Sequence, residues 1–171
     1  MSESRKTQRR IGGTMILLAC LLCLGLLTLL FDNILEKQRN PNSGLGGPSP
    51  DGPREVVLRR DRSGHYVAPG YINEQPVRFL LDTGATRVSV PSAVAERVGL
   101  SRGRPGRVST ANGTIVVYGT RLDQVSLGNI TLQNVLADIN PHMPGNTVLL
   151  GMSFMKHLEL VQRGDTMTLR Q

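Results

Sequence analysis

Hydrophobic positions divide the chain into three stretches of different character. Residues 11–31 form an uncharged run of 21 positions rich in leucine, long enough for a helix to cross a bilayer core. Residues 32–54 contain many Gly, Pro and Ser and few apolar side chains, which is typical of a flexible linker. From residue 55 onward, short apolar segments alternate with turn residues. The pattern therefore predicts an anchor, a linker and one β-rich domain over residues 55–171.

Within the last stretch, the alternation of apolar and polar positions predicts short strands at 56–60, 65–72, 75–81, 88–90, 134–140 and 167–170. Pro at the start and Gly at the end predict one short helix over residues 91–98. Asn-Gly at 112–113 is the strongest of several hairpin signals, which also occur at 73–74, 128–129 and 163–164.

The charge pattern predicts how the apolar run is oriented. Residues 1–10 hold four bases, whereas only Lys37 and Arg39 follow the run closely, so the N-terminus is expected in the cytoplasm. The run is too long for a signal peptide and lacks a small-residue exit, which favours an uncleaved anchor. The net charge of +7 is spread over the chain, and residues 55–171 contain no run of basic residues interleaved with aromatic ones. We therefore expect no nucleic-acid partner.

Cysteine and histidine positions argue against a metal or a cofactor. Cys20 and Cys23 both lie in the apolar run, so the domain has no disulfide. The segment ending at Cys20 loosely resembles a lipoprotein box, but the apolar run continues beyond it. His65, His142 and His157 lack the spacing of metal ligands. No cofactor is expected.

The strongest chemical signal is Asp82-Thr83-Gly84, directly after the apolar residues of the strand predicted at 75–81. A carboxylate at the end of a buried strand is costly unless its charge is satisfied or shared. Such a placement therefore indicates a catalytic role for Asp82.

This motif resembles the signature of aspartic proteases, and Ala85 narrows the resemblance to the retropepsin-like group. The family's second element, an apolar-apolar-Gly run, matches Val148-Leu149-Leu150-Gly151, which ends 67 residues after Gly84. The resemblance implies an all-β fold, a closed barrel with one short helix, here preceded by a transmembrane helix. It also implies a bacterial protein of the inner membrane, single-pass, with its catalytic domain in the periplasm.

Aspartic protease chemistry needs two carboxylates that share one proton, and the chain has one Asp-Thr-Gly motif. Asp123 and Asp138 are not followed by Thr/Ser-Gly. We therefore expect a homodimer in which each protomer contributes Asp82. The resemblance implies that Thr83 supports the dimer and that Gly84 lets the backbone approach an extended polypeptide substrate.

The hairpin around Asn112-Gly113 lies between the two family elements, where family members carry a mobile flap. The resemblance implies that Ala111, Asn112 and Gly113 cover the substrate, although an ordinary surface hairpin has the same pattern. Two other functions remain open. The domain could bind peptides or assist assembly without cutting, because fold does not fix function, or the motif could be a coincidence in an unrelated β-domain.

Overall fold

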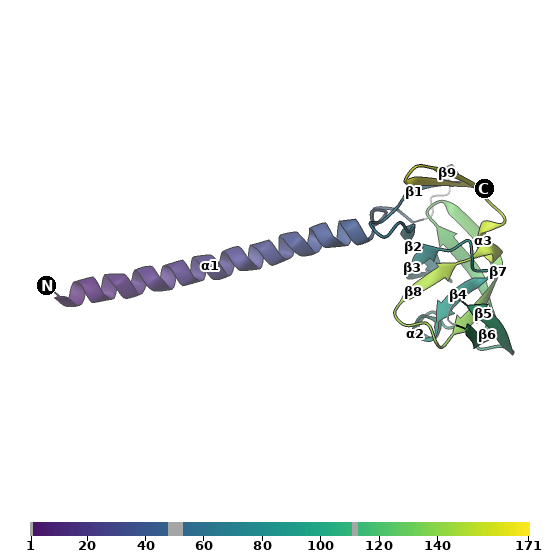
Figure 1. The fold of residues 1–171 in the computed structure, drawn as a ribbon, viewed down its shortest axis with the longest axis horizontal. Coiled ribbons are helices and arrows are strands. Elements are labelled where there is room, and N and C mark those ends of the chain that lie inside the picture. The colour runs from purple at the N-terminus through teal and green to yellow at the C-terminus, as the bar shows by residue number, and fades with distance from the viewer. Residues whose placement is uncertain (1, 48–52, 111–112) are drawn as a thin grey trace. The chain divides into compact units, whose positions relative to one another are not determined.

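The computed structural model describes residues 2–47, 53–110 and 113–171. The chain forms two compact units, residues 1–38 and 39–171. The described part of the first unit is helical throughout and belongs to α1 (Ser2–Arg39), which includes the uncharged run at 11–31 (Figure 1). Its large apolar side chains from Met15 to Phe31 are exposed. Within the described residues, no helix is both long enough and apolar enough to cross a membrane.

The second unit is built around a β-barrel of six strands (Figure 1). The closed barrel agrees with the fold that the family resemblance implies. Hydrogen bonds between β2 and β6 close the ring, and β5 (Pro105–Thr110) continues the sheet along the other part of β6. In ring order, the strands are β2 (Val67–Ile72), β3 (Gln75–Leu81), β8 (Thr147–Leu150), β4 (Val88–Pro91), β7 (Ile130–Asn140) and β6 (Gly113–Leu127).

A smaller sheet and two short helices complete the domain. The sheet has the order β1 (Glu55–Arg59), β10 (Thr166–Arg170) and β9 (Glu159–Arg163). One helix is α2 (Ser92–Arg97), where a helix is predicted. The expectation of a single short helix is wrong, because α3 (Met152–Met155) forms a second one. Its one turn is too short to give a periodic signal in the sequence.

The turns of the barrel follow the hairpin signals closely. Strand β3 has the predicted bounds, and the turn that precedes it places Asn73 and Glu74 at φ angles of 48° and 66°. Two successive residues at positive φ are characteristic of the tight turn that matches the twist of paired strands. This turn fixes the register with which β3 runs toward Asp82.

The hydrophobic core fills the barrel and the space beneath the small sheet. Aliphatic side chains dominate it, and its largest fully buried residues include Phe79 on β3 and Phe154 on α3. Because Phe79 lies three positions before Asp82, the strand that carries the aspartate is held by the centre of the core.

Part of the segment predicted as a linker packs on the domain. Asn42 is only 7% exposed, and its amide nitrogen donates hydrogen bonds to Arg59 O at 2.9 Å and Val67 O at 2.7 Å. Its amide oxygen accepts a bond from Arg59 N at 2.8 Å. Leu45 packs against the core. The compact domain therefore extends N-terminally beyond the start predicted at residue 55.

Candidate active site

Two neighbouring parallel strands, β3 and β8, end side by side at Asp82. Strand β3 pairs with β8 in a register that sets Leu81 beside Leu150. Directly after this pair, Asp82 N donates a hydrogen bond to Leu150 O at 3.2 Å. The aspartate is therefore anchored by its backbone at the point where both strands end, and its side chain is half-buried.

The loop that follows β3 holds the carboxylate by a local turn. Gly84 N donates to Asp82 Oδ1 at 2.9 Å, and Ala85 N donates to Asp82 O at 3.2 Å. A backbone N–H bonded to a carboxylate oxygen fixes the direction of the side chain. Thr83 and Gly84 are exposed, and Ala85 is half-buried. All four predicted loop residues thus lie together in one turn.

The apolar-apolar-Gly element lies directly against this loop, in agreement with the sequence prediction. Met152 N donates to Ala85 O at 2.8 Å, and Ser153 N donates to Thr86 O at 3.0 Å. A Cβ atom on Gly151 would lie 2.3 Å from Arg87 O and 2.6 Å from Ala85 O. Because these are backbone oxygens, no rotamer change relieves the overlap. Glycine is therefore required for the loop to pack here.

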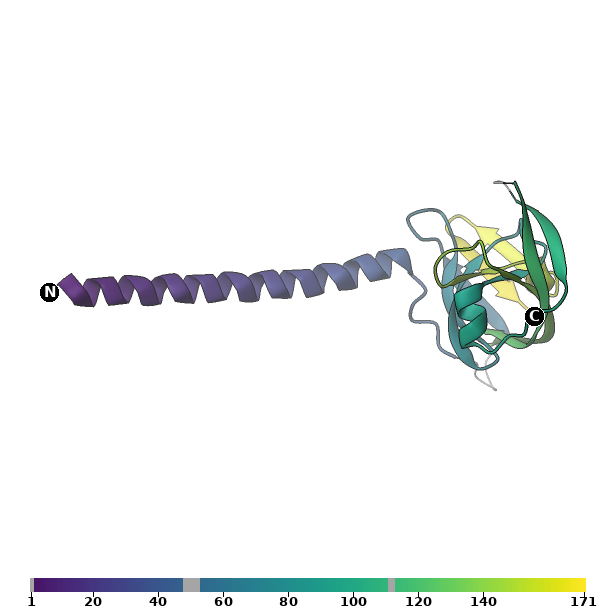
Figure 2. The ribbon, with the colours of Figure 1, turned by 90° about the horizontal axis from the view of Figure 1, so that it is seen from below.

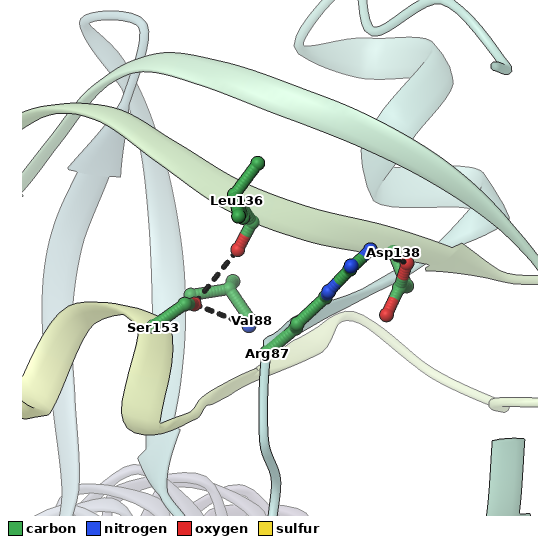
Figure 3. A network of polar contacts seen from close by, with 5 residues as sticks. All are labelled: Arg87, Val88, Leu136, Asp138 and Ser153. Atoms are coloured by element: carbon green, nitrogen blue, oxygen red, sulfur yellow. Dashed lines mark hydrogen bonds and ion pairs between the residues drawn. The ribbon is translucent and has the colours of Figure 1, made fainter.

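The side chains of Arg87 and Ser153 secure the end of the loop through three polar contacts, none of which was predicted from the sequence (Figure 3). Arg87 Nη1 lies 3.2 Å from Asp138 Oδ1 on β7. Ser153 Oγ accepts a bond from Val88 N at 3.0 Å and donates to Leu136 O at 2.7 Å. Asp138 thus pairs with an arginine. The sequence offered one indication of the Ser153 contacts: Ser153 lies two residues after Gly151, next to the element that packs against the loop.

The predicted hairpin is present and consists of β5 and the first part of β6. Every residue of β5 is exposed, and the hairpin projects from the barrel (Figure 2). Gly113 begins β6 at a φ of 113°, and Thr110 Oγ1 donates to its carbonyl oxygen at 2.8 Å. Ala111 and Asn112 lie outside the described residues. The assignment of these residues as a flap stays a prediction.

A known protein family matches the part of the chain that contains the site. The family described as "gag-polyprotein putative aspartyl protease" matches residues 68–157, about half of the chain. The chain belongs to this family of retropepsin-like aspartic proteases. The matched range includes both the loop that begins at Asp82 and the element that ends at Gly151.

Two individual proteins resemble this retropepsin-like chain. A retropepsin-like aspartic protease from Rickettsia conorii, known as a crystal structure, is 25% identical, with a TM-score of 0.58. The match covers 67% of this chain and 89% of that one. An uncharacterized protein in the cobV 5′ region of a Sinorhizobium species is 33% identical over 124 residues, covering 70% of this chain and 53% of its own length. The chain thus spans about half the length of that curated relative.

Proposed function

We propose that the protein is an aspartic endopeptidase whose active site forms when two copies each contribute Asp82. The observation that carries this proposal is the position of Asp82 directly after β3, at the start of a loop whose carbonyl oxygens accept hydrogen bonds from the first two residues of α3, Met152 and Ser153. The sequence holds one Asp-Thr-Gly motif. Since the chemistry needs two carboxylates, a two-fold dimer is the simplest way to supply the second.

In the proposed dimer, one Asp82 carboxylate removes a proton from a water molecule, and the other, protonated, donates its proton to the oxygen of the scissile carbonyl. The water oxygen bonds to the carbonyl carbon. Transfer of a proton to the amide nitrogen then allows the C–N bond to break, which yields a carboxyl and an amino terminus. No metal or cofactor takes part in these steps. In this proposal Thr83, which is exposed in the single chain, contacts the second copy.

The proposed substrate is an extended polypeptide, because the exposed strand β5 offers backbone hydrogen-bonding groups at the edge of a sheet. An extended chain can pair with such an edge as an added strand. Gly113 permits the tight turn of the hairpin that carries this edge. In this proposal the hairpin closes over the bound chain, with Ala111 and Asn112 at its tip.

We also propose that residues 11–31 anchor the protein in the inner membrane, with the N-terminus in the cytoplasm and the catalytic domain in the periplasm. The support comes from the sequence and not from the described helix: it is the length of the uncharged run and the four bases that precede it. Fractionation tests this part separately. Retention in membrane pellets after alkaline carbonate washing is expected, and release into the supernatant would contradict it.

The proposed catalysis is tested with purified protein and an unstructured polypeptide at mildly acidic pH. Asp82→Asn keeps the shape of the side chain but removes the carboxylate, so cleavage should fall by more than about 10³-fold. Asp123→Asn, at an exposed position of β6, is a matched control and should retain activity. Undiminished cleavage by Asp82→Asn would refute the proposal. A domain that binds peptides without ever cutting them would support the non-catalytic alternative.

A further inference from the structure

We propose that Ser153 is a positioning residue for the active-site loop, which it holds through the backbone on both sides of Arg87. This inference rests on the proposed function, because its consequence for catalysis depends on Asp82. The loop from Asp82 to Val88 has two ends. The first is tied to β8 by the bond from Asp82 N to Leu150 O. Ser153 holds the second end, at Thr86 and Val88.

Ser153 contacts three separate segments of the chain. Its backbone N–H donates to Thr86 O at 3.0 Å. Its hydroxyl accepts a bond from Val88 N at 3.0 Å and donates to Leu136 O at 2.7 Å. A serine hydroxyl has one hydrogen to donate and lone pairs to accept, so both side-chain bonds form together. Figure 3 shows the hydroxyl between these two partners.

The position of the hydroxyl explains why a polar side chain is needed here. Strand β4 begins at Val88 and pairs in parallel with β7 from Ala137 onward. The hydroxyl therefore lies where the ladder between these strands starts, and it links Val88 N to the β7 carbonyl that precedes Ala137. Val88 is fully buried. Without the hydroxyl, its N–H and the carbonyl of Leu136 would both lose a partner.

Arg87 lies between the two residues that Ser153 holds. Its guanidinium extends to Asp138 on β7, so β7 restrains its side chain while α3 restrains its backbone neighbours (Figure 3). The loop is thereby fixed at its exit from two directions. Since misplacing a catalytic group by about 1 Å can cost about 10²-fold in rate, a loosened exit should lower turnover.

The test compares Ser153→Ala, Ser153→Thr and Ser63→Ala in the full-length protein. Threonine keeps the hydroxyl, and Ser63 lies in an exposed turn outside the site. We expect Ser153→Ala to lower kcat per folded protomer about tenfold with KM within twofold. Ser153→Thr should recover most of this loss, and Ser63→Ala should match the unsubstituted protein. An unchanged kcat per folded protomer in Ser153→Ala would overturn the inference.

A second readout keeps the inference testable even if no proteolysis is found. Hydrogen exchange of the amides from Gly84 to Val88 should be at least tenfold faster in Ser153→Ala than in Ser63→Ala. Equal exchange in the two variants would overturn the positioning role, whereas absent proteolysis with faster exchange would overturn only the proposed function. In a double-mutant cycle, Ser153→Ala and Asp138→Asn should act non-additively on kcat, because both restrain the same short segment. Additive effects would contradict the shared restraint.

Discussion

The loop that carries Asp82 and the β5–β6 hairpin are both exposed segments of one barrel, but they are held in different ways. The loop is bonded from β8 at its start and from α3 at Ala85 and Thr86. The hairpin strand β5 pairs only with β6 among the described strands, and all its residues are exposed. Local stability therefore differs between the segment that bears the carboxylate and the segment proposed to cover the substrate.

This difference matches two different requirements of a protease that acts on polymers. A catalytic carboxylate has to be held within a fraction of an ångström of its working position. A covering segment has to open to admit an extended chain and then close. In this molecule, the Asp82 loop has backbone hydrogen bonds to buried or half-buried partners, which would serve the first requirement. The exposed β5–β6 hairpin is the segment that we propose for the second.

Among changes that compare the loop with the hairpin, Gly151→Ala has the largest expected effect, because it disturbs the packing behind the loop. The new Cβ would overlap the carbonyl oxygens of Arg87 and Ala85, at 2.3 Å and 2.6 Å. Overpacking against backbone atoms should lower the free energy of unfolding by about 3 kcal/mol. We also expect kcat to fall by about 10²-fold as the loop shifts. Denaturant unfolding and cleavage kinetics measure the two effects.

Gly46→Ala is the control for this substitution, because a Cβ there meets no atom within 4 Å. It should leave both unfolding and kcat unchanged. If Gly151→Ala instead behaves like this control, the loop is not buttressed as described, and the contrast with the hairpin disappears.

A smaller effect is expected from Gly113→Ala in the hairpin. At a φ of 113°, an alanine is strained by about 1 kcal/mol. Strain in the covering segment should weaken substrate binding, so KM should rise about fivefold with less effect on kcat. Gly64→Ala, at a φ of 83° in a separate turn with open space around it, introduces similar strain elsewhere. A rise in KM for both variants would show that the hairpin has no special role.

The smallest expected difference is measured without any substitution, as the rate of amide hydrogen exchange in the two regions of the unsubstituted protein. Amides of β5 and its partners in β6 should exchange at least tenfold faster than those of β3, whose neighbours β2 and β8 cover both its edges. Mass spectrometry of peptides from the two regions compares them directly. Equal protection would mean that the hairpin is as firmly held as the barrel.

The sequence predicted most of what local signals control. Alternation of buried residues and the turn at Asn73-Glu74 were enough to give β3 its bounds, and the Asn-Gly signal located the β5–β6 hairpin. The apolar run before Gly151 was recognised from its residue types, although the strand β8 that it forms was not predicted. Each of these features is encoded within a few consecutive positions.

Contacts between distant segments were not predictable in this way. Asn42 bonds Arg59 and Val67, across 17 and 25 positions, so a segment of linker composition becomes part of the domain. Ser153 and Val88 are 65 positions apart. Such contacts depend on how elements meet in space, and a single polar residue gives no sign of them in the sequence.

The central claim is that two copies share one active site, each contributing Asp82, and mixing experiments test it most directly. Unsubstituted protein is exchanged with an excess of Asp82→Asn protein, and cleavage is measured per unsubstituted protomer. If the site is shared, mixed dimers are inactive, so activity per unsubstituted protomer should fall toward zero as the fraction of Asp82→Asn rises. Activity that stays constant per unsubstituted protomer, under conditions where subunit exchange is demonstrated, would contradict the claim.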